Sequence, residues 1–179
     1  MRHIMLDLET VSNRYDAGIA SIGAIRFDPN TQQLGESFYM VLERSSMKLG
    51  HVDVDTMLWW AQQEREALRV LYDDSLSRVN LSVALLSFTV FCKSVPESIV
   101  WGNGSTFDNV ILHNAYDDMG LECPIGRKLD YCYRTVRRMF PMEEEARQGV
   151  YHNALDDARH QARHLMKVLR KINWEKEPK

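Results

Sequence analysis

The stretch Arg2 to Thr10, R-H-I-M-L-D-L-E-T, holds a short apolar run that ends on Asp7, with Glu9 two residues later. A run this short and apolar is typical of a buried β-strand. Side chains two apart on a strand point to the same face, so Asp7 and Glu9 should project side by side. Neighbouring carboxylates repel each other unless one is protonated or a cation lies between them, and Mg²⁺ prefers carboxylate oxygens. The stretch therefore predicts a metal-binding strand end or, alternatively, two solvated acids in a turn.

Size and composition favour one domain, residues 1–179, with a flexible tail expected over 173–179. The formal net charge of −3 gives no global attraction to nucleic acid, so such binding needs a local patch or a metal. No apolar run approaches the roughly 20 residues of a membrane span, and the first strand leaves no room for a signal peptide. The three cysteines match neither a disulfide framework nor a zinc spacing. We therefore expect a protein of the reducing cytoplasm that does not associate with membranes.

The remaining pattern predicts a mixed sheet. Strands over Ile19–Phe27 and Gly35–Glu43, joined at the turn Asp28-Pro29-Asn30, should form a three-stranded antiparallel meander with the first strand. Gly23, inside the second strand, indicates a close strand crossing or a bulge. A further strand over Ser98–Trp101 and one short strand after it would complete five. Helices are expected over Asp53–Ala61, Gln62–Tyr72 (as its continuation or a separate helix), Leu81–Val95, Thr106–Met119, Cys132–Phe140 and Ala154–Ile172. Helices interleaved with a mixed sheet make an α/β layered domain.

Two helices carry specific packing expectations. Val83, Leu86 and Val90 should form the apolar face of Leu81–Val95. Trp59 and Trp60 are adjacent, so they point in different directions on a helix. Either both pack in the core, as aromatic residues usually do, or one is exposed as a stacking platform for a nucleic-acid base.

Asp108 lies at the start of the Thr106–Met119 helix, three residues after Ser105. One interpretation is helix capping, because S-x-x-D is a variant of the capping box and acids are favoured in the first turn. The other is a ligand, because strand, glycine turn and helix deliver this acid just beyond a strand end, where open α/β sheets bind their ligands.

His152 and Asp157 would lie about 140° apart on one helix. They can converge only if His152 lies in the preceding loop and Asp157 in the first turns. Asn153 is a suitable N-cap for that arrangement, with Asp156 assigned to capping and Asp157 to chemistry, although the two roles could be exchanged. Four carboxylates so gathered can hold two Mg²⁺ or Mn²⁺ ions about 3.5–4 Å apart, an arrangement suited to phosphodiester hydrolysis. A histidine near neutral pKa could take the proton of the attacking water.

Three segments resemble the exonuclease motifs of the DEDDh family, the DnaQ-like branch of the RNase H-like fold: D-L-E-T from Asp7, F-D-N from Phe107 and H-N-A-L-D-D from His152. I-S-I-G-A-I and T-M-L-W-W-A-Q-Q further resemble a small bacterial and phage branch of single-domain 3′–5′ exoribonucleases, some labelled exodeoxyribonuclease VIII. Two departures are the T-V-S that follows Glu9, where proofreading subunits have T-T-G, and Asn103, one residue further from the aspartate than in many relatives.

The resemblance implies an RNase H-like fold and stepwise release of nucleoside 5′-monophosphates from single-stranded 3′ ends, with RNA favoured over DNA. It implies that Asp7, Glu9, Asp108 and Asp157 are metal ligands, that His152 is the general base, and that the protein forms a homodimer. The side chains expected to contact nucleic acid are Thr10, Trp59, Phe107, Arg134, Arg137 and Arg138.

The last three of these belong to a basic cluster with Arg127 and Lys128, in which Asp130 is the only acid. The cluster could bind phosphates or be a solvated helix face. Two other functions stay open: a non-catalytic module that binds nucleic-acid ends, and a phosphodiesterase for dinucleotides or other short oligonucleotides.

Overall fold

A computed structural model of the chain describes residues 1–143 and 146–174, and in this part the strands form one six-stranded sheet of order β4-β3-β2-β1-β5-β6. The strands are β1 (His3–Thr10), β2 (Ile19–Asp28), β3 (Gln33–Leu42), β4 (Arg78–Val79), β5 (Ile99–Gly102) and β6 (Asp130–Cys132). β1, β2 and β3 form the predicted antiparallel meander, and each remaining strand is parallel to its neighbour. The predicted count of five was one too low. The missing strand, β4, has two residues, and only its pairing with Val41 and Leu42 defines it.

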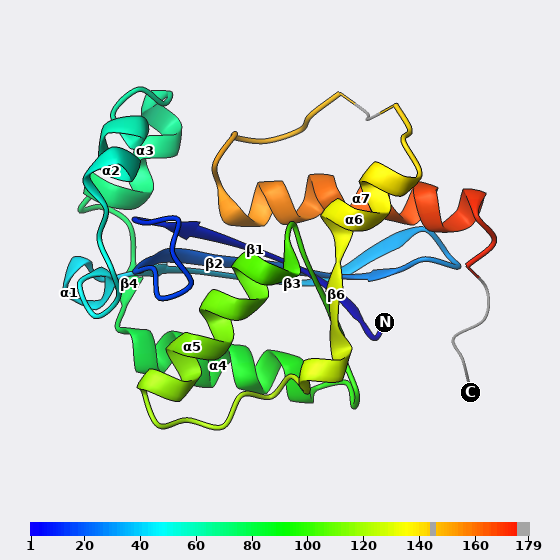
Figure 1. Ribbon diagram of the computed structural model, residues 1–179, viewed down its shortest axis with the longest axis horizontal. Helices are drawn as coiled ribbons and strands as arrows, with labels where there is room; N and C mark the ends of the chain where they lie inside the picture. The colour runs from blue at the N-terminus through cyan, green and yellow to red at the C-terminus, as the bar shows by residue number, and fades with distance from the viewer. Residues whose placement is uncertain (144–145, 175–179) are drawn as a thin grey trace.

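Helices cover both faces of the sheet. They are α1 (Arg44–Met47), α2 (Val54–Trp60), α3 (Arg65–Tyr72), α4 (Leu81–Lys93), α5 (Val110–Asp118), α6 (Tyr133–Met139) and α7 (Ala154–Lys171), with a π-helical turn at Ser105–Asn109 and a 3₁₀ turn at Arg127–Leu129. In Figure 1, α6 and α7 lie above the sheet and α4 and α5 below it, whereas α2 and α3 stand at one end. None of the described helices is long and apolar enough to cross a bilayer.

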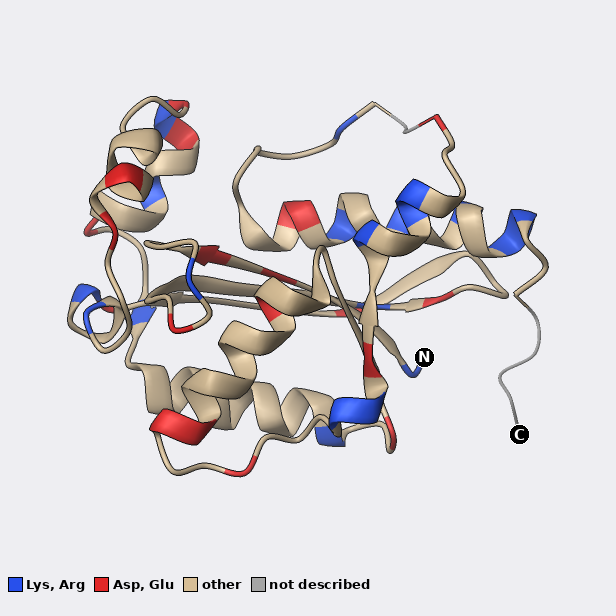
Figure 2. Ribbon diagram, viewed as in Figure 1, with Lys and Arg blue, Asp and Glu red and all other residues tan. Residues whose placement is uncertain are grey.

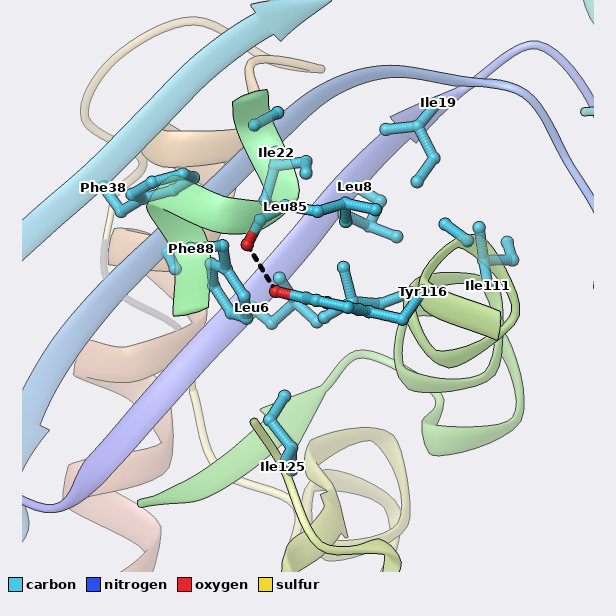
Figure 3. Packing of buried hydrophobic residues seen from close by; sticks show 14 of the residues in the cluster. Leu6, Leu8, Ile19, Ile22, Phe38, Leu85, Phe88, Ile111, Tyr116 and Ile125 are labelled. Carbon is cyan, nitrogen blue, oxygen red and sulfur yellow. Dashed lines mark hydrogen bonds between the residues drawn. The ribbon is translucent and has the colours of Figure 1, made fainter. Parts of the chain in front are cut away.

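β1 separates two parts of the core. Ile4, Leu6 and Leu8 belong to the cluster shared with α4 and α5, in which the hydroxyl of Tyr116 donates a 2.6 Å hydrogen bond to the carbonyl of Leu85 (Figure 3). Met5 belongs to the cluster on the α7 side. Alternation along the strand therefore places Asp7 and Glu9 on the α7 face, at the end of the buried run.

The predicted apolar face of α4 was wrong. Val83, Leu86 and Val90 are 43%, 52% and 72% exposed. The buried face consists of Leu81, Ala84, Leu85, Phe88, Phe91 and Cys92. This helix is apolar on both sides, so periodicity alone does not select one. The selection comes from aromatic packing, because the ring centroids of Phe88 and Phe91 lie 5.3 and 5.6 Å from that of Phe38 on the sheet.

Two residues of the predicted tail, Asn173 and Trp174, are among the described residues. Trp174 packs against the core beneath α7, and its ring centroid lies 6.5 Å from that of Trp101. Of the predicted tail, residues 175–179 lie outside the described residues. Cys92, Cys123 and Cys132 are free thiols, as predicted.

Candidate active site

Asp7 and Glu9 are buried at the end of β1, 9% and 6% exposed, so the interpretation as solvated acids in a turn was wrong. The amide nitrogen of Gln161 on α7 donates a 2.7 Å hydrogen bond to Oδ1 of Asp7. Glu9 Oε1 is buried without a hydrogen-bond partner among the described residues. A buried acceptor left unpaired is costly, so this oxygen indicates a group that the protein binds.

Gly23 brings the start of α7 to these acids. It pairs with Asp7 across the sheet, and a Cβ placed on it would overlap the backbone of Ala154 and Leu155. The close approach that its position predicted is thus made by a helix rather than by a strand crossing. Because glycine has no side chain, the first turn of α7 can lie directly on the strand beside Asp7.

Asp108 reaches the same place from the other side of the sheet. Gly104, with φ of +122°, turns the chain after β5 into the π-helical turn that contains Asp108. No side chain caps this turn. The Asp108 carboxylate instead accepts a 3.2 Å hydrogen bond from the backbone N–H of Leu8 on β1. The capping-box interpretation was therefore wrong, and Asp108 belongs to the strand end. Irregular turns of this kind are frequent at functional sites.

His152 and Asp157 converge as predicted. His152 lies in the loop before α7 with φ of +59°, and the Asn153 side chain caps the helix by accepting from the N–H groups of Leu155 and Asp156. Ligand atoms of Glu9, His152 and Asp157 all lie within 4.8 Å of one another. Asp156 points elsewhere, because its carboxylate accepts a 2.9 Å hydrogen bond from the N–H of Val150. That bond stabilises the loop rather than the helix N-terminus, but it leaves Asp157 as the acid that faces the site.

Burial and mutual repulsion perturb the acids strongly. Burial, followed by the charges of Asp108 and Glu9, raises the pKa of Asp7 well above its ordinary value. Burial and the charge of Asp108 raise the pKa of Glu9 to about 8, and burial raises that of Asp108 to about 7. Such a cluster favours protons or cations near neutral pH. Carboxylate oxygens with one imidazole are donors that Mg²⁺ or Mn²⁺ accept, so these residues fit a divalent-cation site.

Sequence reasoning did not single out Arg147, which lies in the loop between α6 and α7. Arg147 forms an ion pair with Asp157, and its charge opposes the raised pKa values of Asp7 and Glu9. Burial, together with the charge of Arg147, lowers the pKa of His152. No local pattern could have revealed this residue, because its partners come from β1 and α7.

A cavity of about 360 Å³ opens beside the acids, lined in part by Glu9, Thr10, Trp59 and Phe107. Trp59 and Trp60, next to each other in the chain, differ in exposure. Trp60 is 1% exposed and donates a 2.9 Å hydrogen bond from its indole nitrogen to the carbonyl of Thr10. Trp59 is 41% exposed, and its ring centroid lies 4.8 Å from that of His152. One tryptophan therefore packs in the core while the other leaves its ring accessible at the site.

The basic cluster is only partly at the site. The Arg134 guanidinium lies beside Gly104 and slightly offsets the rise in the pKa of Asp108 that burial causes. Arg137 and Arg138 are exposed in the last turn of α6, where Figure 2 shows Lys and Arg along α6 and the second half of α7. Arg127 pairs with Asp117 at 3.6 Å, away from the acids.

Asp130, the one acid in that cluster, is not a surface group. Its two oxygens lie 2.8 Å from Asn109 Nδ2 and 2.8 Å from His113 Nε2. This contact ties β6 to the chain immediately after Asp108, so Asp130 has a structural role at the site's edge.

The mixed sheet, with acids and a histidine gathered at one strand end, fits the fold and the site that the resemblance to the DEDDh exonucleases implied. The chain belongs to the family described as the 3′–5′ exoribonuclease Rv2179c-like domain, whose model matches residues 2–169. No curated protein matches the chain.

Solved structures support the fold at low sequence identity. Exonuclease X in complex with 5′ overhanging duplex DNA has a TM-score of 0.63 and 13% identity, covering 96% of this chain and 93% of that one. The nuclease domain of 3′hExo, a DEDDh family member bound to rAMP, has a TM-score of 0.59 and 12% identity, covering 94% and 92%. E. coli Exonuclease I with a dT13 oligonucleotide has a TM-score of 0.67 and 13% identity, covering 96% of this chain and 42% of that one.

Proposed function

We propose that the protein uses two divalent cations, Mg²⁺ or Mn²⁺, to remove nucleoside 5′-monophosphates from the 3′ ends of single-stranded nucleic acid, RNA in preference to DNA. The observation that carries the proposal is the meeting of Glu9, His152 and Asp157 within 4.8 Å at the strand end that also holds Asp7 and Asp108. The description of the matched family supports the RNA preference.

Asp7, Glu9, Asp108 and Asp157 would hold the cations. When bound, the cations lower the pKa of a water and stabilise charge on the leaving oxygen. The contacts of Asp7 with Gln161 and of Asp108 with the Leu8 N–H keep both carboxylates oriented before any cation arrives. Such preorganisation removes the cost of rearranging the acids during the reaction.

His152 would act as the general base. Its lowered pKa leaves the imidazole neutral near pH 7, as a proton acceptor must be. The His152 and Trp59 rings meet in a T-shaped contact, which restricts the orientation of the imidazole. The imidazole is thereby held next to the acids, in position to take a proton from an attacking water.

The terminal nucleotide would occupy the cavity beside the acids. Trp59 and Phe107 offer aromatic surfaces to its base, and Thr10 lies at the same wall. Arg134 would contact a phosphate near Asp108, and Arg137 and Arg138 would contact the strand further from the cut. A homodimer and a cytoplasmic location stay predictions. Light scattering that gives the mass of a monomer would reject the dimer.

The test compares two adjacent acids. Asp157→Asn should lower nucleotide release by roughly 10³-fold, because several kcal/mol of charge stabilisation are lost. Asp156→Asn is the matched control and should keep most of the activity, since an amide oxygen can still accept from the Val150 N–H. End-labelled RNA and DNA of equal sequence, incubated with Mg²⁺, Mn²⁺ or chelator, give the rates and the sugar preference.

The same panel separates the competing functions. Oligonucleotide binding without mononucleotide release in either metal would favour the binding module and reject the exonuclease. Turnover of a dinucleotide far above that of a longer oligomer would favour the short-substrate phosphodiesterase. Equal losses in the Asp156 and Asp157 variants would contradict the assigned roles of the two acids.

A further inference from the structure

The loop between α6 and α7 carries Arg147 into the acid cluster. The Arg147 and Asp157 side chains are only 15% and 13% exposed, and they form an ion pair. The loop is fastened to α7 on both sides of Arg147: the Met142 carbonyl lies 3.3 Å from His164 Nε2, and the Val150 N–H donates to Asp156. The guanidinium is thus held at the site by the chain around it.

The surroundings of this guanidinium differ from those of a structural arginine. A guanidinium has five N–H donors and normally satisfies them when buried. The buried arginines Arg26 and Arg78 each donate from their terminal nitrogens to several backbone carbonyls. Arg147 instead has the Asp157 carboxylate as its ion-pair partner and the Tyr151 ring centroid 3.8 Å from its Cζ, and its buried Nε and Nη2 lack a hydrogen-bond partner among the described residues. Charge rather than a complete hydrogen-bond set therefore holds it in place.

We propose that Arg147 is the resident cation of the acid cluster in the metal-free protein, and that divalent cations must displace it to bind. The inference rests on the proposed function for the identity of the site. A guanidinium and a divalent ion that both contact the Asp157 carboxylate repel each other strongly in a buried site, so the binding of one disfavours the other. Arg147 thus competes with the metal for Asp157 and offsets part of the acids' mutual repulsion until the metal arrives.

The competition has a measurable cost in metal affinity. When only a fraction of the molecules has an open site, the apparent dissociation constant is the intrinsic constant divided by that fraction. If Arg147 fills the site in about nine of ten molecules, its removal should strengthen metal binding about tenfold. The metal-free protein should lose stability at the same time, because the acids then lack their internal cation.

The first experiment measures binding of Mn²⁺ alone by calorimetry, in the full-length chain. Arg147→Gln should bind Mn²⁺ about tenfold more tightly than the unchanged protein and should melt at a lower temperature in chelator. Arg159→Gln is the matched control, since Arg159 pairs with the neighbouring Asp156 at 3.4 Å and does not enter the cluster. Equal or weaker Mn²⁺ binding by Arg147→Gln overturns the proposal, even if the protein proves to be a metal-dependent nuclease.

A second measurement uses the unchanged protein, so it does not depend on a variant that folds. Phenylglyoxal modifies accessible arginines, and mass spectrometry locates the modified positions. Arg147 should be protected in chelator and become modified in Mg²⁺, whereas modification of Arg159 should not depend on the metal. Equal modification of Arg147 in both conditions overturns the displacement. If the unchanged protein shows no nuclease activity, the proposed function is rejected. The dependence of Arg147 modification on Mg²⁺ can still be measured in that case.

Discussion

The two ends of β1 differ in how completely their buried charges are paired. Near its start, where Ile4 pairs with Arg26 of β2, the Arg26 side chain is 4% exposed and donates to the carbonyls of Met1, Phe91 and Cys92 and to two serine hydroxyls. At its other end, Asp7, Glu9 and Asp108 repel one another, and Glu9 Oε1 has no hydrogen-bond partner among the described residues.

The difference separates a charge used for folding from charges kept for a ligand. Phe91 and Cys92 lie in the last turn of α4, whose carbonyls have no partner within the helix. Arg26 satisfies them from the sheet and interacts favourably with the helix dipole. At the acid end, Gln161 and the Leu8 N–H donate to Asp7 and Asp108, but Glu9 Oε1 lacks a partner among the described residues, so protons or cations should stabilise that end. Three predictions sharpen this contrast.

The largest effect on stability is expected at the Arg26 end. Arg26→Met should lower the free energy of unfolding by roughly 1.5–3 kcal/mol. The Phe91 and Cys92 carbonyls lose their charged donor and keep only neutral ones among the described residues, from Ser94 Oγ, Ser98 Oγ and the Val95 N–H. Urea denaturation measures the loss. Arg26→Lys should recover only part of it, since an ammonium lacks the planar fork of donors. Arg14→Met is the control, because Arg14 is exposed and its removal should matter little. A loss no greater than that of the control would contradict the structural role of Arg26.

A smaller effect, which depends on pH, is expected at the acid end. The pKa of Glu9 rises from 4.5 to about 8 on folding, so the folded state binds this proton more tightly than the unfolded state. Its contribution to stability is therefore complete below pH 4.5 and is lost as the pH rises to about 8. In chelator, the urea midpoint should fall over this range, and Mg²⁺ should oppose the fall.

Glu9→Gln should flatten that pH dependence, because the amide does not titrate. The pKa of Asp108, raised to about 7, should leave a residual slope. Glu122→Gln, at an exposed position, should reproduce the slope of the unchanged protein. If the Glu9 and Glu122 variants gave the same slope, Glu9 would not be the source of the pH-dependent stability.

The smallest of the three effects concerns substrate at the acid end. Trp59→Ala should raise the KM for a single-stranded oligonucleotide about tenfold, since base stacking contributes roughly 1–3 kcal/mol per base. Steady-state kinetics would measure it, with kcat changed less than KM. Trp59→Phe should retain most of the affinity because it keeps an aromatic face. A KM unaffected by the alanine variant would mean that the exposed ring does not hold a base.

Local sequence predicted the conformations that bring the candidate site residues together. The apolar run before Asp7, the N-cap at Asn153 and the five-residue separation of His152 from Asp157 each fix conformation through neighbours in the chain. Whether Asp108 caps its helix or faces the strand was left open. The Leu8 N–H decides it, and that group lies 100 residues earlier in the chain.

The sequence by itself determined which acids and which histidine the protein has, and the order of strands and helices that carries them, because alternation, capping and turn preferences act over a few residues. The tertiary structure alone decided that α4 buries its phenylalanines rather than Val83, Leu86 and Val90, and that Arg147 enters the acid cluster. Those outcomes depend on what each side chain meets across the fold. Packing and charge pairing between distant segments leave no periodic trace along the chain.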